Sequence, residues 1–144
     1  MTSRIEAPKS SEENKALIRR YYLELWNAWS FSLAEELVSP DIDFRGSLGI
    51  AVRGLEGFKG YMNRVRSAFP DFHNTIEDLI AEGNTVVARL TYTATHRGEL
   101  FGIEPTGRRV AYPGVAVFTI SEGKIRAGWA LGDTDSLRAQ LAAD

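Results

Sequence analysis

The hydrophobic pattern of this chain changes its period at Pro70. Before Pro70 the apolar side chains recur every three or four positions, as they do on one face of a helix. After Pro70 they alternate, as they do in a half-buried strand. Helices therefore come first and a series of strands follows, which predicts an α+β fold with helices packed on one face of a sheet.

The N-terminal half predicts three helices. The first begins at Ser11, where acidic residues in the first turn suit a helix N-terminus. Its apolar stripe comprises Leu17, Ile18, Tyr21, Tyr22, Leu25, Trp26 and Trp29. A short second helix over 32–38 should be stopped by Pro40. The third helix, 55–69, should end at the next proline.

The strands should form a short segment at 41–45 and then two hairpins. The hairpin turns are expected at 82–84 and 121–123, each containing glycine. Their strand runs exceed the usual ~5–6 residues, so the sheet must twist and curve around the helices, leaving a cavity at its wide end. Pro113-Gly114 interrupts one run and predicts a bulge or bend. A short helix over 134–142 should close the chain.

Length and composition favour one domain of 144 residues, with a disordered segment at 1–10 and the folded domain at 11–144. The net charge of −2 gives no basic patch for nucleic acid. The absence of cysteine excludes disulfides, thiolate metal sites and a cysteine nucleophile. We find neither a secretory signal nor an apolar run of the ~20 residues that a membrane span needs, so we expect a soluble, cytoplasmic protein.

One histidine lies on the core-facing row of a predicted strand. That row comprises Val86, Ala88, Leu90, Tyr92, Ala94 and His96. His96 ends the row, so we expect it at the mouth of the cavity. Two interpretations stay open: a partly buried histidine held by a backbone carbonyl, or a general base whose ordinary pKa of about 6.5 suits proton exchange near neutrality.

A metal site and a phosphate site are not expected. His73 should lie on the face opposite the apolar row of its strand, which is Phe72, Ile76 and Ile80. Two histidines on opposite faces of a sheet cannot share one iron centre. The segment GIEPTG at 102–107 lacks the lysine of a phosphate loop and instead fits a type I turn starting at Glu104.

The last predicted strand leads to a carboxylate. Asp133 could cap the final helix, or it could serve as a carboxylate at the cavity mouth, and the sequence supports both roles equally. Gly128, Ala130 and Gly132 form a row of small residues on that strand. Such a row leaves room for a ligand.

These features, in this order, resemble the SnoaL-like polyketide cyclase family of the NTF2-like, ketosteroid-isomerase-like superfamily. The matching pieces, within about 14–141, are HRGELFGIEPTG at 96–107, GKI at 123–125, Trp129, Asp133 and QL at 140–141. The resemblance implies an NTF2-like cone, in which N-terminal helices pack inside a strongly curved, mostly antiparallel sheet around a deep ligand cavity. It also implies dimers or tetramers formed through the outer sheet face, where Val115, Val117 and Thr119 lie.

The resemblance also bears on the chemistry. The family's aromatic polyketide cyclases close the last ring of an anthracycline by aldol condensation, with an acid/base aspartate and a second pocket histidine. The matching positions here are Ala130 and Ala116, and neither side chain can carry a proton. This favours a cofactor-independent tailoring enzyme of the anthracycline hydroxylase type, in which the reduced substrate supplies electrons to dioxygen and a separate reductase is the partner.

Two alternatives remain: a cyclase or isomerase with relocated acid/base residues, and a non-catalytic protein that binds a small hydrophobic ligand. For the enzyme, we expect His96 as the base and Asp133 as its orienting group or an alternative base. Aromatic walls suited to a flat polycyclic ligand are expected from Trp26, Phe44, Tyr61, Phe69, Tyr92 and Trp129. No cofactor-binding or metal-binding residue is expected.

Overall fold

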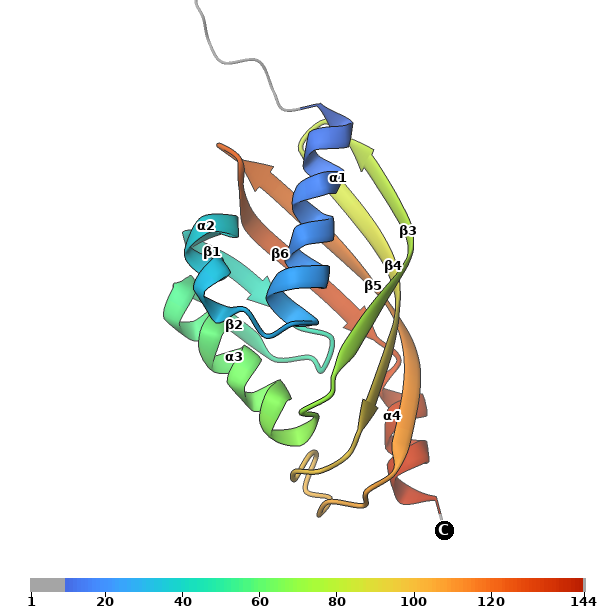
Figure 1. The fold of residues 1–144 in the computed structure, drawn as a ribbon. Coiled ribbons are helices and arrows are strands. Elements are labelled where there is room, and N and C mark those ends of the chain that lie inside the picture. Colours follow the sequence, from blue (N-terminus) through green and yellow to red (C-terminus); the bar gives the residue numbers. More distant parts are fainter. Residues whose placement is uncertain (1–9, 144) are drawn as a thin grey trace, which may run out of the picture.

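A six-stranded sheet curves around the N-terminal helices in the computed structural model, which describes residues 10–143 (Figure 1). The strand order is β2-β1-β6-β5-β4-β3. Only β1 and β6 pair in parallel. The strands are β1 (Val38–Arg45), β2 (Ala51–Arg53), β3 (His73–Glu82), β4 (Thr85–Thr95), β5 (Arg109–Ser121) and β6 (Lys124–Gly132). The predicted α+β fold with a curved, mostly antiparallel sheet is confirmed.

The first helix, α1 (Ser11–Arg20), begins at Ser11 as predicted, and Ser10 is its N-cap. The Ser10 hydroxyl accepts a hydrogen bond from the Glu13 backbone N–H at 3.1 Å, and the Glu13 carboxylate accepts one from the Ser10 N–H at 3.0 Å. This reciprocal capping box satisfies two backbone donors that the first turn would otherwise leave unpaired. The expected disordered segment, 1–10, lies outside the described residues except for Ser10, which caps α1.

A π-helix, Tyr21–Trp26, continues α1 directly. The Asn27 N–H donates to the Tyr22 carbonyl at 2.9 Å, five residues back. The wider turn brings four buried side chains to the sheet: Tyr21, Tyr22, Leu25 and Trp26. The predicted stripe is wrong at Trp29, which lies beyond the helix with φ of 53° and donates its indole N–H to the Pro70 carbonyl at 2.9 Å.

The other helices are α2 (Ala34–Leu37), α3 (Gly54–Ala68) and α4 (Thr134–Ala142). Pro40 does not stop α2 as predicted, because β1 already begins at Val38 and contains Pro40. The helices predicted at 55–69 and 134–142 are confirmed. Helix α4 packs beside β5, where the Gln140 amide exchanges two hydrogen bonds with the Ala111 backbone, at 3.0 and 2.7 Å.

Strand β3 reverses its alternation half way along. Its register against β4 shifts between Ile76 and Asp78, which marks a bulge. One extra residue flips every later side chain to the other face. Ile80, predicted to face the core, is therefore 65% exposed, and its neighbour Leu79 packs on the core instead. The alternation predicted for β4 is confirmed.

The sequence predicted a bulge or a bend at Pro113-Gly114. No bulge occurs, because β4 and β5 pair without a register shift there, and the bend stays a prediction. Proline has no backbone N–H to donate to a neighbouring strand. At Pro113 no hydrogen bond to β6 is lost, because β6 pairs with β5 only from Gly114 onward. Gly114 is needed for space: a Cβ built there would lie 2.3 Å from the Tyr92 ring.

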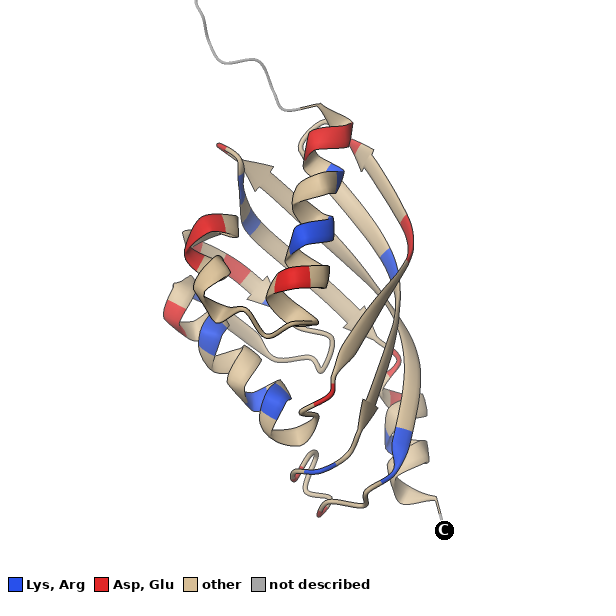
Figure 2. Ribbon diagram, in the orientation of Figure 1, with Lys and Arg blue, Asp and Glu red and all other residues tan. Residues whose placement is uncertain are grey.

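Charged residues are distributed over the helices, strands and loops, with acids and bases interspersed (Figure 2). Seven ion pairs join them among the described residues, and none combines two buried side chains. Pairs of this kind contribute little to stability. No helix of residues 10–143 is long and apolar enough to span a membrane.

Candidate functional site

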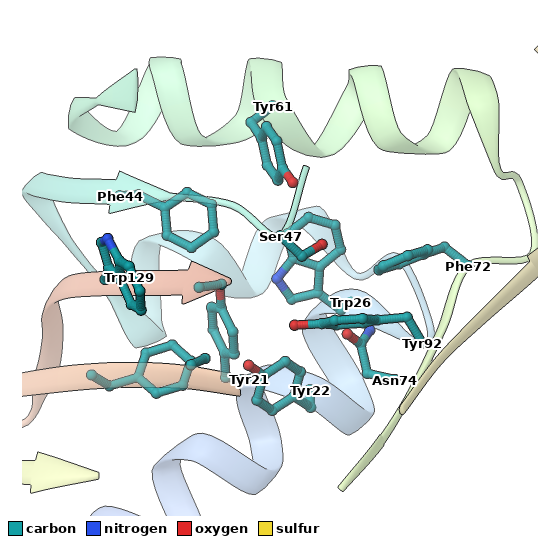
Figure 3. A pocket seen from close by; sticks show the side chains of 13 residues that line it. Tyr21, Tyr22, Trp26, Phe44, Ser47, Tyr61, Phe72, Asn74, Tyr92 and Trp129 are labelled. Atoms are coloured by element: carbon teal, nitrogen blue, oxygen red, sulfur yellow. The ribbon is translucent and has the colours of Figure 1, made fainter. Parts of the chain in front are cut away.

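A pocket lies between the π-helix, α3 and the concave face of the sheet (Figure 3). Thirteen residues line it: Tyr21, Tyr22, Trp26, Phe44, Ser47, Tyr61, Phe72, Asn74, Tyr92, Ala116, Phe118, Trp129 and Ala130. Five of the six aromatic walls expected from the sequence are among them. Trp129 is at the rim, 47% exposed, with the Arg45 guanidinium 5.4 Å from its ring centre.

The aromatic rings nearly fill the pocket. The cavity that they leave has a volume of only about 20 Å³. Edge-to-face contacts hold the rings in place: Trp26 lies 6.0 Å from both Tyr61 and Phe72 between ring centres. A polycyclic ligand must therefore displace some of these side chains when it binds.

No acid, histidine, lysine or arginine appears among the described residues that line the pocket. Ala116 and Ala130 stand opposite one another in the β5–β6 ladder, and both line the pocket. The two alanines, which the sequence resemblance matches to acid/base positions of the cyclases, thus lie in the pocket wall and present only methyl groups.

The polar groups on the residues that line the pocket are hydroxyls, the Asn74 amide and the indole N–H groups of Trp26 and Trp129. Burial raises the pKa of all five tyrosines of the chain, that of Tyr61 to about 12. Each phenol therefore keeps its proton near neutrality and can donate a hydrogen bond. Ser47, from the loop between β1 and β2, lies 3.5 Å from the Tyr112 hydroxyl, oxygen to oxygen.

An asparagine pair fixes the end of the π-helix. The Asn27 side chain donates to the Asn74 carbonyl at 3.0 Å and accepts from the Asn74 backbone N–H at 2.8 Å. The Asn74 side-chain amide donates to the same Asn27 oxygen at 3.0 Å. Because Trp26 immediately precedes Asn27, this clamp between the helix and β3 sets the position of the Trp26 ring.

Phe69 does not line the pocket, contrary to the prediction. It is fully buried in the layer behind, with its ring stacked on Phe72 at 6.1 Å between centres. The apolar face predicted for the third helix is buried, as expected. Phe69, however, is the C-cap of α3, and its side chain packs at the far end of the core.

His96 faces inward as predicted, but it does not line the pocket, so its expected place at the cavity mouth is wrong. It is 0% exposed. Its Nδ1 accepts a hydrogen bond from the Thr106 backbone N–H at 3.1 Å and lies 3.0 Å from the Thr106 hydroxyl. A neutral ring that accepts at Nδ1 carries its proton on Nε2, and that buried atom has no hydrogen-bond partner.

The loop after His96 folds back over it. Its turn lies at Leu100–Ile103, where Phe101 and Gly102 both have positive φ, and not at Glu104 as predicted. The loop begins under the C-terminal end of α3, where the Arg97 and Gly98 N–H groups donate to the Ala68 carbonyl at 2.9 and 3.1 Å. His96 is thus the buried anchor of a loop, although its catalytic role stays a prediction.

Asp133 is exposed and caps α4. Its side chain accepts a hydrogen bond from the Ser136 backbone N–H at 3.0 Å. The structure therefore supports its capping role, whereas its catalytic role stays a prediction. The neighbouring small row does not leave open space: Phe44 and Phe118 cover Gly128, and Tyr112 and the Ser47 backbone cover Gly132.

No group of three potential metal-ligating side chains occurs within residues 10–143. His73 is exposed and lies outside the aromatic pocket, so the two histidines are separated as predicted. On the outer sheet face a wider, open hollow of about 640 Å³ includes Val117, Thr119 and Trp129. The expected association through this face stays a prediction.

Several pocket residues escaped the sequence reasoning. Ser47 lies in a short irregular loop that carries no periodic signal, and Asn74 occupies an apolar row where a polar residue was not expected. Phe118 could have been found, because strand alternation places it in the same inward row as Ala116. Tyr21 and Tyr22 were identified only as helix core.

A family model described as SnoaL-like polyketide cyclase matches residues 16–141. AclR of Streptomyces galilaeus, a candidate hydroxylase, is 32% identical, with 92% of this chain and 82% of AclR covered at a TM-score of 0.79. IdmH of Streptomyces antibioticus, a candidate polyketide cyclase, is 27% identical, with coverage of 90% and 99% and a TM-score of 0.78.

A SnoaL-like polyketide cyclase candidate of Jannaschia sp. CCS1 superposes at a TM-score of 0.86. It covers 99% of both chains at 22% identity, so this likeness concerns the fold alone. Comparison with curated protein sequences gave no match.

Proposed function

Because this chain belongs to the SnoaL-like polyketide cyclase family, we propose that it is a tailoring enzyme for aromatic polyketides, of the hydroxylase type and not an aldol cyclase. The observation that carries the proposal is the pocket wall. By the family resemblance, Ala116 and Ala130 match the acid/base positions of the cyclases, and the described lining holds no acid, histidine, lysine or arginine. The pocket instead offers aromatic faces and hydroxyl donors. The 32% identity to AclR, a candidate hydroxylase, also supports a function of the hydroxylase type.

In the reaction we propose, a reduced polycyclic hydroquinone supplies the electrons. Dioxygen takes two electrons from the hydroquinone, which becomes a quinone, and two from the ring C–H bond that becomes C–OH. One oxygen atom enters the product and the other leaves as water. The chain's own part is to orient the ring between aromatic walls and to exclude bulk water. A separate reductase would regenerate the hydroquinone form.

The test uses 1,4,9,10-tetrahydroxyanthracene, the hydroquinone of 1,4-dihydroxyanthraquinone, under ¹⁸O₂. Mass spectrometry should show a trihydroxyanthraquinone carrying one ¹⁸O atom, formed faster with the protein than without it. No gain in rate over the uncatalysed reaction would overturn the hydroxylase. A cyclase should be tested in parallel with an open-ring polyketide analogue, whose ring closure releases water without needing oxygen.

A non-catalytic binding protein is the second candidate. The absence of acidic, histidine, lysine and arginine side chains from the described pocket lining favours it, because a pure binding site needs none. It predicts saturable binding of the same anthraquinone with neither oxygen incorporation nor ring closure.

A further inference from the structure

Four hydroxyl groups from four separate elements converge at one end of the pocket. Ser47 comes from the β1–β2 loop, Tyr61 from α3, Tyr92 from β4 and Tyr112 from β5. Burial is the main cause of the raised pKa of these three tyrosines. The Ser47 hydroxyl oxygen lies 3.5 Å from that of Tyr112, and the Tyr92 and Tyr112 ring centres are 4.9 Å apart. Figure 3 shows the hydroxyl ends of Tyr61 and Tyr92 pointing into the pocket near Ser47. We call these four residues the hydroxyl cluster.

Close packing against glycines fixes the hydroxyl cluster. A Cβ built on Gly46 would lie 2.0 Å from the Tyr61 ring, and one on Gly114 would lie 2.3 Å from the Tyr92 ring. At Gly132 it would lie 2.8 Å from the Ser47 carbonyl oxygen and 3.0 Å from the Tyr112 ring. Real side chains essentially never approach so closely, so each member occupies space that only a glycine leaves free. The donors are therefore held in place before a ligand binds.

The cluster presents donors and no charge. The Tyr61 oxygen already accepts a hydrogen bond from the Leu48 backbone N–H at 3.3 Å, which leaves its own proton available to a partner. Tyr112 lies behind the pocket wall beside Ser47, whereas Ser47, Tyr61 and Tyr92 line the pocket. The adjacent wall is apolar, so a hydrogen bond formed here is stronger than one formed in water.

We propose that Ser47, Tyr61 and Tyr92 form a hydrogen-bond donor site for one carbonyl or enolate oxygen of a planar polycyclic ligand, with Tyr112 as the positioning residue. This proposal rests on the proposed function, since it names the atom by which the substrate is held. Preorganised donors in an apolar site are also suited to stabilising negative charge that develops on that oxygen. The ligand class is therefore a polycyclic ketone or quinone, and a hydrocarbon of the same shape is excluded.

The test compares anthraquinone with anthracene, which share one ring skeleton and differ in the carbonyls. Quenching of tryptophan fluorescence measures both dissociation constants, since Trp26 lines the pocket. The wild-type chain should bind anthraquinone at least tenfold more tightly. Tyr92→Phe and Tyr61→Phe should each weaken anthraquinone binding about 5- to 30-fold and leave anthracene binding unchanged, as expected for loss of one buried hydrogen bond.

Tyr22→Phe is the matched control, because it removes a phenol from the same pocket but not from the hydroxyl cluster. It should preserve the ratio of anthraquinone to anthracene affinity. An infrared spectrum gives a second readout: the carbonyl stretch of bound ¹³C-labelled anthraquinone should lie at lower frequency in the wild type than in Tyr92→Phe. Equal affinity for both ligands in the wild type, or equal weakening of both by Tyr92→Phe, would overturn the donor site.

The outcomes also separate this proposal from the proposed function. Selective anthraquinone binding without oxygen incorporation would keep the donor site and reject the hydroxylase. Oxygen incorporation at an unchanged rate in Tyr61→Phe and Tyr92→Phe, with an unshifted carbonyl stretch, would keep the hydroxylase and reject the donor site.

Discussion

One column of aromatic rings joins two unlike regions of this molecule. It runs from Tyr112 to Tyr92, Phe72, Phe69 and His96, with successive ring centres 4.9, 5.6, 6.1 and 6.0 Å apart. The tyrosine end belongs to the hydroxyl cluster and faces the pocket. The histidine end is sealed under a loop and has one unpartnered nitrogen.

The difference between these two ends shows that a conspicuous sequence motif need not lie in the pocket. His96 and its Pro-Thr-Gly sequence carry the family resemblance, yet the structure gives them a loop to anchor. The hydroxyl groups that line the pocket belong to ordinary tyrosines and a loop serine. Rare residue types attract attention in a sequence, whereas a site built from common hydroxyls becomes visible only when their convergence is seen.

The largest expected difference between the two regions appears in alkali. In the unfolded chain tyrosines ionise near pH 10, but burial raises the pKa of all five in the folded chain, that of Tyr61 to about 12. Stability is therefore complete below pH 10 and falls as pH rises towards 12, by about 1.4 kcal/mol per pH unit for each tyrosine. Tyrosinate absorbance at 295 nm should rise together with the loss of circular dichroism. A rise of the tyrosinate absorbance near pH 10, while the circular dichroism stays native, would show that burial does not raise the pKa of the tyrosines.

His96→Ala tests the other end of the column. Loss of the hydrogen bond to the Thr106 N–H and of a fully buried ring should lower the free energy of unfolding by about 2–4 kcal/mol. His96→Asn should lose less, because its side-chain oxygen can replace Nδ1 as the acceptor. Urea unfolding measures both variants. If Ala and Asn are equally stable, the hydrogen bond does not anchor the loop.

Gly114→Ala should destabilise the chain by about 1–3 kcal/mol, since the new methyl group collides with the Tyr92 ring and approaches the Leu131 carbonyl. It should also weaken the preference for anthraquinone over anthracene. Gly60→Ala is the matched control: nothing lies within 4 Å of the added Cβ on α3, so stability should rise by up to about 1 kcal/mol. The account fails here if both variants change stability in the same direction.

The smallest effect is expected at Asp133. Asp133→Ala removes the cap of α4 and should cost about 1 kcal/mol, while Asp133→Ser should retain most of the stability because serine caps equally well. Thermal unfolding distinguishes the two. Neither variant should alter turnover by more than about threefold, and a large loss of turnover in both would restore the catalytic role.

The sequence predicted the regular parts of the fold and little of what interrupts them. Alternation placed Tyr92 and His96 on the inward row of β4, because strict pairing leaves no freedom there. It failed at Ile80, since a bulge inserts one residue without a compositional mark. The sequence also mispredicted the turn in the loop after His96. The nearby Pro-Thr-Gly segment suggested a turn there, but the turn forms around Phe101-Gly102, where both residues have positive φ.

For the site, the limit lies in tertiary contact. Five aromatic walls followed from helical and strand periodicity, but periodicity cannot say which inward residue reaches the pocket and which packs behind it. Phe69 and Tyr61 both come from the α3 segment, and only Tyr61 lines the pocket. Ser47 joins three tyrosines through a loop whose conformation is set by contacts with Gly132, far along the chain.

The central claim is that the hydroxyl cluster, and not the histidine, acts on the substrate. The direct measurement is the rate of ¹⁸O incorporation into 1,4,9,10-tetrahydroxyanthracene by Tyr92→Phe and by His96→Asn, each expressed per folded molecule. We predict a fall of about tenfold or more for Tyr92→Phe, as expected for one lost transition-state hydrogen bond, and a change within threefold for His96→Asn. A rate that survives Tyr92→Phe and collapses with His96→Asn would contradict the account.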